Sequence, residues 1–96
     1  MKVVYHPDVQ KDVSLILRHY DAISPRLGDD FWAEFSAGIE RVAENPLRFH
    51  PAATGLRRFN FAKFPDHFLD RVLPDRVRIT VVRHDKQHPR RGLDRR

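Results

Sequence analysis

The chain has 96 residues, of which 41% are hydrophobic and 32% are charged, and none is cysteine. This length suits one compact domain over residues 1–96, whose small core leaves no room for a deep substrate cavity. The lack of cysteine excludes a disulfide framework and thiolate metal ligands. Pro7 ends the short apolar run 3–5, so no signal peptide is visible, and no stretch is long enough to span a bilayer. We therefore expect a cytoplasmic protein without membrane contact.

The formal net charge of +5 is unevenly distributed along the chain. Residues 1–55 contain six Lys or Arg and eight Asp or Glu, a balance of −2, whereas residues 56–96 contain twelve and five, a balance of +7. This asymmetry indicates an anionic partner for the second half, namely nucleic acid, an acidic peptide or an acidic protein surface. The alternative is that the arginines form a face that only keeps the protein soluble.

Two amphipathic helices are predicted in the first half, after a short strand over Lys2–His6. The first helix begins near Pro7, which suits the first turn of a helix, and it ends near Asp21. Its apolar stripe consists of Val9, Val13, Ile16, Leu17 and Tyr20.

The second helix begins at Ser24-Pro25, a capping hydroxyl followed by proline at the first helical position, and it ends at Asn45-Pro46. Gly38 lies within it, where the lack of a side chain permits a neighbouring element to approach closely. Only residues 22–24 join the two helices, which predicts an antiparallel hairpin whose apolar stripes need a sheet to cover. The stripe of the second helix consists of Leu27, Phe31, Phe35, Ile39 and Val42.

The second half is predicted to be mostly β-structure. After a loop over residues 46–55, three strands are expected, over residues 56–64, 67–73 and 76–84. Because these strands follow one another closely, they form an antiparallel meander. The fold class is therefore α+β with the order β-α-α-β-β-β, in which the helical hairpin packs on one face of a small antiparallel sheet. Residues 85–96 are basic, lack an apolar period and are expected to form an extended or partly disordered tail.

The sheet face that points away from the helices is the candidate site. Alternation in the last strand places Val77, Ile79 and Val81 toward the core, and Arg76, Arg78, Thr80 and His84 outward. In the first strand of the meander, Arg58 and Asn60 face outward. The middle strand has no clean apolar side, and His67 and Arg71 are assigned to the outward face.

A surface rich in arginine and histidine suits cleavage of RNA by its own ribose 2′-hydroxyl. That reaction needs a base, an acid and cations that stabilise charge on the phosphorane. His67 and His84 are the one plausible acid–base pair, and Arg71 can stabilise charge. The alternative is that both histidines are ordinary surface residues. His84 and His88 are four apart without a carboxylate cluster, and no phosphate-binding glycine loop is present, so neither a metal nor a cofactor is expected.

Several short motifs follow one another in a specific order: Tyr5-His6-Pro7, Asp12, Ser24 to Gly28, Phe31 to Phe35, Asn45-Pro46, Gly55 to Phe59, Phe64-Pro65, Arg71-Val72 and Val82-Arg83-His84. In this order they resemble the RelE/ParE superfamily of toxins from bacterial type II toxin–antitoxin systems, over nearly all of the chain. The resemblance implies a compact α/β toxin and a cognate antitoxin that wraps and masks it in a hetero-oligomer. RelE-like members cut mRNA in the ribosomal A site without a metal, whereas ParE-like members inhibit DNA gyrase.

The candidate residues match the two branches of this superfamily unequally. Arg58 and Asn60 stand where RelE-like nucleases carry lysines, and His67 and Gln87 stand where they carry arginines. Since the nuclease set is partly replaced, the resemblance favours the ParE-like, plasmid-stabilisation branch and growth inhibition through DNA gyrase. A RelE-like mRNA endonuclease and a non-toxic nucleic-acid-binding module are the alternatives. The residues predicted to bind nucleic acid or the target are Arg58, Asn60, Arg78, Arg83 and Arg90.

Overall fold

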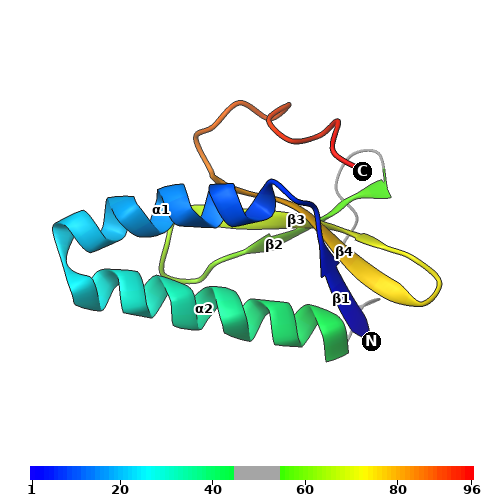
Figure 1. Ribbon diagram of the computed structural model, residues 1–96, viewed down its shortest axis with the longest axis horizontal. Helices are drawn as coiled ribbons and strands as arrows, with labels where there is room; N and C mark the ends of the chain where they lie inside the picture. The colour runs from blue at the N-terminus through cyan, green and yellow to red at the C-terminus, as the bar shows by residue number, and fades with distance from the viewer. Residues whose placement is uncertain (45–54) are drawn as a thin grey trace.

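Helices and strands follow one another in the predicted order β-α-α-β-β-β (Figure 1). This computed structural model describes residues 1–44 and 55–96, so the predicted helix end at Asn45-Pro46 and nearly all of the predicted loop 46–55 lie outside the described residues. Within the described part, no helix is both long and apolar enough to cross a membrane. The elements are β1 (Lys2–Tyr5), α1 (Val9–Ile23), α2 (Pro25–Glu44), β2 (Arg57–Asn60), β3 (Asp66–Val72) and β4 (Arg76–His84).

The strands of the described residues build one mixed sheet with the order β1-β4-β3-β2. β2, β3 and β4 form the antiparallel meander that the sequence predicts. β1 pairs in parallel with β4, so the expected antiparallel arrangement applies to the meander and not to the whole sheet. The long connection through both helices provides the crossover that a parallel pair requires.

The helical hairpin lies across one face of the sheet (Figure 1). Ser24 makes the tight link, because its N–H donates to the Tyr20 carbonyl at 3.0 Å and its carbonyl accepts from the Leu27 N–H at 3.0 Å. The predicted close approach at Gly38 is confirmed, since a Cβ there would lie 2.8 Å from Cε1 of Phe59. Six phenylalanines fill the interface between hairpin and sheet: Phe31, Phe35, Phe59, Phe61, Phe64 and Phe68.

A β-bulge in β4 reverses the alternation of its side chains. The register shifts at Thr80, which has no partner residue on β3, and Leu69 pairs with Val81. Val82 therefore packs in the aromatic core beneath the helices, while Val81 packs on the opposite face of the sheet. The alternation predicted from the sequence is wrong beyond Thr80, because one extra residue moves every later side chain to the other face. His84 consequently lies on the helix side of the sheet.

The C-terminal segment, residues 85–96, is not the extended or disordered tail that the sequence predicts. It forms a series of turns that fold back onto the body of the protein (Figure 1). Gly92 adopts a φ of +77°, and a Cβ there would lie 2.6 Å from Cγ2 of Val81, so the backbone lies directly against the sheet. A small apolar cluster anchors the segment and consists of Leu56, Leu69, Val81 and Leu93.

Candidate functional site

Most of the predicted site residues lie on the sheet face opposite the helices, which we call the far face. Cross-strand pairing joins Asn60 to His67 and Arg71 to Arg78, so these side chains share one face, as the sequence predicts. The C-terminal segment covers part of this face through Leu93. The far face is therefore divided into a part that the segment covers, around Leu69 of β3 and Val81 of β4, and a more open part near the C-terminus, where Arg71 lies.

His67 is buried in the covered part, with only 1% of its surface exposed. Its Nδ1 lies 2.7 Å from Oδ1 of Asp85, and its Nε2 accepts a hydrogen bond from Nε of Arg83 at 2.8 Å. Burial lowers the pKa of His67, and the charges of Arg58 and Arg83 lower it further, against the hydrogen bond to Asp85. The ring is therefore neutral, with its proton on Nδ1, and neither nitrogen is free to take a proton from a substrate.

Three of the residues predicted to bind a target are engaged in contacts within the protein. Nε of Arg58 donates to Oδ1 of Asn60 at 2.7 Å, and its Nη2 donates to Oδ1 of Asp85 at 3.3 Å. Nη1 of Arg83 donates at 2.7 Å to two carbonyl oxygens of the C-terminal segment, those of Pro89 and Arg91. These contacts hold the segment in place, so they do not leave Arg83 available as a surface cation.

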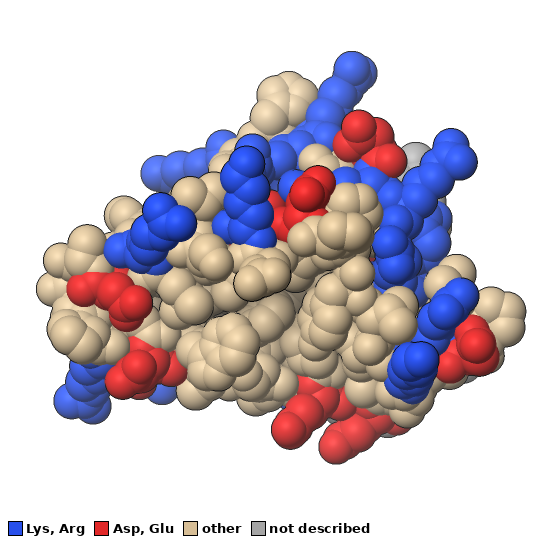
Figure 2. All heavy atoms as spheres, viewed as in Figure 1, with Lys and Arg blue, Asp and Glu red and all other residues tan. Residues whose placement is uncertain are grey.

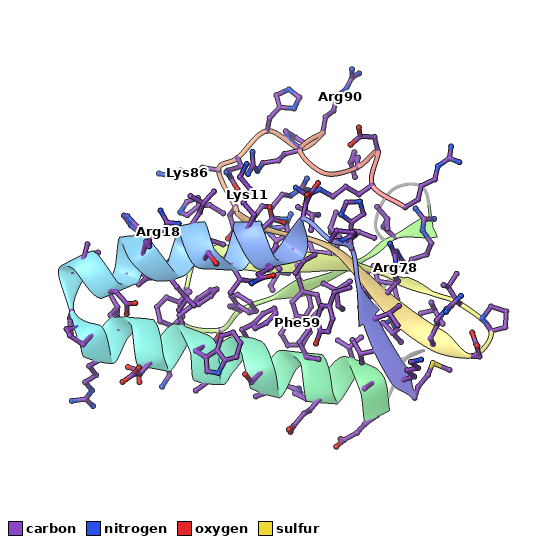
Figure 3. The ribbon with its side chains drawn as sticks, viewed as in Figure 1. Lys11, Arg18, Phe59, Arg78, Lys86 and Arg90 are labelled. Carbon is purple, nitrogen blue, oxygen red and sulfur yellow. The ribbon has the colours of Figure 1, made fainter. Side chains whose placement is uncertain are left out.

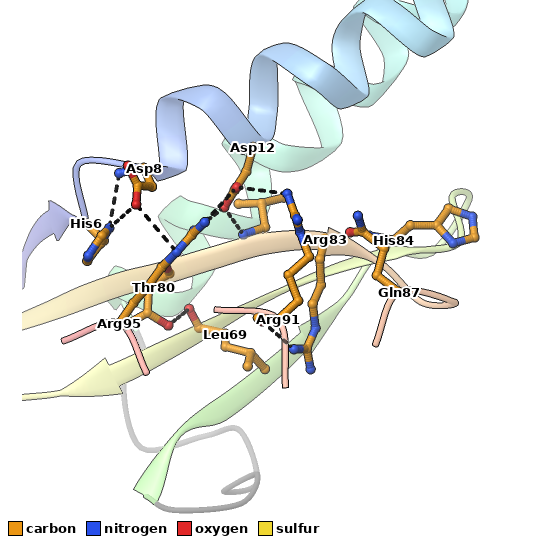
Figure 4. A network of polar contacts seen from close by, with 11 residues as sticks. His6, Asp8, Asp12, Leu69, Thr80, Arg83, His84, Gln87, Arg91 and Arg95 are labelled. Carbon is orange, nitrogen blue, oxygen red and sulfur yellow. Dashed lines mark hydrogen bonds and ion pairs between the residues drawn. The ribbon is translucent and has the colours of Figure 1, made fainter. Parts of the chain in front are cut away.

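Asp12 is the second attachment point of the C-terminal segment (Figure 4). Its carboxylate is buried and accepts two hydrogen bonds from the guanidinium of Arg95, at 2.5 and 3.1 Å. It also accepts the N–H of Val82 at 3.1 Å, immediately after the bulge. The sequence predicts no role for Arg95. The available signal was the acidic Asp12, which borders the apolar stripe of the first helix, where an unpaired carboxylate would be costly to bury.

The structure does not bring His84 together with His67. His84 lies on the helix side, in a shallow pocket that His19 and Tyr20 of α1 and Asp66 also line. The hydroxyl of Tyr20 donates to Oδ2 of Asp66 at 2.5 Å, and burial raises the pKa of Asp66 even though this hydrogen bond lowers it. The two predicted acid–base residues therefore face different sides of the sheet. No three His, Asp or Glu side chains in residues 1–44 and 55–96 are placed to hold a metal ion.

The guanidinium groups of Arg71, Arg78 and Arg90 form no ion pair and no hydrogen bond with the described residues. Arg71 and Arg90 line an open cavity near the C-terminus, together with Arg95 and Arg96. Of the residues that the sequence proposed for catalysis or for binding, these three arginines have charged groups that no described residue engages.

A second surface, which we call the apolar groove, lies between α1 and α2 where β1 ends. Tyr5 and Trp32 are its exposed large apolar side chains, at 46% and 51%. Figure 2 shows that the middle of this face is mostly uncharged, with Lys and Arg gathered above it. Side chains that line the groove include Tyr5, Pro7, Val13, Leu17, Trp32 and Phe35.

The fold is similar to that of a chain in the structure described as "Chromosomal ParDE TA system from P. aeruginosa", with a TM-score of 0.76 and 17% sequence identity. The match covers 88% of this chain and 95% of that chain. No model of a protein family matches the sequence, and no curated protein matches it. At this identity the similarity concerns the fold, and it confirms the fold that the sequence motifs imply.

Proposed function

We propose that this protein is the toxin of a toxin–antitoxin pair, of the ParE-like type, and that a cognate antitoxin keeps it inactive. The observation that carries the proposal is the structural match over 88% of the chain to a chain of a ParDE toxin–antitoxin system. The order of the sequence motifs supports it independently, because each motif alone is weak but their spacing follows the superfamily pattern.

The apolar groove supports the antitoxin part of this proposal. Exposed aromatic side chains that share one groove are typical of a surface that a partner covers. Lys11 and Arg18 lie beside the groove on α1 (Figure 3). We therefore expect the antitoxin to contribute an amphipathic segment with apolar residues toward Trp32 and acidic residues toward Lys11 and Arg18.

Induced expression in a bacterial host tests the proposal. Growth should stop on induction, and co-expression of an antitoxin encoded beside the gene should restore it. Trp32→Ser should weaken the rescue, whereas Ile23→Ser, at an exposed apolar position outside the groove, should not. Abundant folded protein that leaves growth unchanged would overturn the proposed function.

The proposed target is DNA gyrase. Purified protein should inhibit the supercoiling of relaxed plasmid by gyrase, and addition of the antitoxin should restore supercoiling. Normal supercoiling in the presence of a protein that stops growth would exclude gyrase as the target.

The alternative, a RelE-like mRNA endonuclease, needs a free base on the far face. His67 does not supply one, because Asp85 and Arg83 engage both of its ring nitrogens. Primer extension on cellular mRNA after induction separates the two functions, since only the nuclease produces new 5′ ends. A non-toxic binding module would instead show salt-sensitive DNA or RNA binding without any effect on growth.

A further inference from the structure

We infer that the open cavity beside the C-terminal segment, which we call the arginine cavity, binds phosphate groups of a nucleic-acid backbone. Its volume is about 640 Å³, and it is lined by Arg71, Arg90, Leu93, Asp94, Arg95 and Arg96. The inference deepens the proposed function, because it names the chemistry of a ligand for the far face.

The positive charge of this cavity is not matched by carboxylates of the described residues. Of its four arginines, only Arg95 is paired, with the buried Asp12. Arg71, Arg90 and Arg96 form no ion pair with the described residues, although Asp94 also lines the cavity. An anion that entered the cavity would meet several guanidinium groups that it could neutralise.

Arg78 adds to the same unmatched charge. It is the cross-strand neighbour of Arg71 on β4, and its Nε is buried without a hydrogen-bond partner among the described residues. Like charges opposite each other on a sheet destabilise it, and a buried donor without a partner adds a desolvation cost. An anion beside Arg71 would reduce the repulsion between the two arginines on β3 and β4.

The chemistry of the lining favours phosphate on a nucleic-acid backbone over an acidic protein. Guanidinium groups bind phosphate through paired N–H donors. Leu93 is the one apolar residue among those that line the cavity, and it already packs on Leu69 and Val81. A protein interface needs an apolar centre, and base recognition in single strands needs aromatic stacking, neither of which this lining supplies. The cavity therefore suits contacts to the phosphates of a nucleic-acid backbone, which are independent of base sequence.

The cavity exists only because the C-terminal segment folds back. Arg71 comes from β3, whereas Arg90 and Arg96 lie on a segment that Gly92, Leu93 and Arg95 attach to the sheet and to α1. In Figure 3, Arg90 projects from this segment into solvent. Binding of a polyanion should therefore also stabilise the segment, because it links both parts of the site.

The double variant Arg90→Gln/Arg96→Gln tests the inference, because both side chains are exposed and without partners among the described residues. Fluorescence anisotropy should measure binding of the purified protein to a labelled duplex of about 20 base pairs over a range of NaCl concentrations. Near 0.1 M salt the variant should bind at least about tenfold more weakly, and the slope of log affinity against log salt should fall by about 2. The matched control is Arg26→Gln/Lys63→Gln, which removes the same charge from exposed positions outside the cavity and should change affinity less than about twofold.

Four results would overturn the inference. Unchanged duplex binding by the double variant would exclude the cavity, and an equal loss in the control would show that only net charge matters. Loss of binding to a polyglutamate peptide with unchanged duplex binding would assign the cavity to an acidic protein. Circular dichroism should show that both variants keep the wild-type melting temperature. A toxic chain that binds no duplex would overturn this inference alone, and a harmless chain that binds duplex would overturn the proposed function alone.

Discussion

The two faces of the sheet are covered by different kinds of contact. On the helix side, Phe31 and Phe68 are fully buried in a continuous aromatic core. On the far face, residues 85–96 form the cover, with Leu93 as the apolar anchor and hydrogen bonds from Arg83 and Arg95. Hydrophobic stabilisation grows with the apolar area buried, so the helix side stabilises the fold, whereas the far face depends on a few specific polar contacts. The far face is therefore the side that substitutions can open without unfolding the protein.

The largest expected effect comes from an aromatic residue on the helix side. Phe68 stacks on Phe59 at a centroid distance of 4.9 Å and is fully buried, so Phe68→Ala should lower the free energy of unfolding by about 3–5 kcal/mol. Leu93→Ala should cost about 1 kcal/mol, because Leu93 is only partly buried. Urea denaturation measures both values. An equal cost at the two positions would contradict the difference between the faces.

The attachment at Asp12 should have the next largest effect. Arg95→Gln leaves the buried carboxylate without its guanidinium partner, and it should lower the free energy of unfolding by about 2–3 kcal/mol. Arg91 is exposed and its Nη2 lies 3.9 Å from the same carboxylate, so Arg91→Gln should cost less than about 0.5 kcal/mol. Chemical denaturation of the two variants provides the comparison, and similar costs would show that Arg95 is no more than a surface charge.

The backbone of the C-terminal segment should be sensitive at Gly92. Gly55 and Gly92 share a φ of +77°, but only at Gly92 would a Cβ collide with the sheet, at 2.6 Å from Val81. Gly55→Ala should therefore cost about 1 kcal/mol for the left-handed backbone alone, and Gly92→Ala about 2 kcal/mol. Thermal denaturation of both variants isolates the contribution of close packing. Equal shifts in melting temperature would contradict the close packing of Gly92 against Val81.

The smallest effect is a pH dependence that originates at His67. Because its pKa is lowered in the folded protein, the unfolded chain binds a proton below about pH 6.5 that the folded protein does not. Stability should therefore fall as the pH drops below that value, by at most about 1.4 kcal/mol per pH unit from this residue. His67→Gln should remove this part of the slope of the unfolding free energy against pH.

Urea denaturation of the parent protein over the same pH range provides the control. Asp66 and Asp70 have raised pKa values because of burial, so their contribution has the opposite sign and is stabilising toward acid. Comparison of the variant with the parent protein cancels that contribution. A slope that is unchanged in His67→Gln would show that the histidine is not buried in a neutral state.

The sequence by itself determined the elements and their order. The apolar stripe of α1 and the Ser24-Pro25 signal predict the helical hairpin, and alternation predicts β4 with the bounds that the structure has, Arg76–His84. These features depend on residues that are close along the chain, because helix and strand periods and capping are local. The assignment of His67 and Arg71 to the far face is also correct, because the extra residue lies in β4 and the alternation along β3 is unbroken.

Only the tertiary structure decided which candidate residues are available to a ligand. The bulge at Thr80 moves His84 to the helix side. No residue type in β4 predicts this change in register. The C-terminal segment buries His67 and engages Arg83, and it does so through a contact between Asp12 and Arg95 that are 83 positions apart. Such contacts depend on how the whole sheet places two distant segments, so local patterns do not encode them. The arginine cavity is a product of the same fold-back, because Arg71 and Arg96 meet only after the chain has closed over the far face.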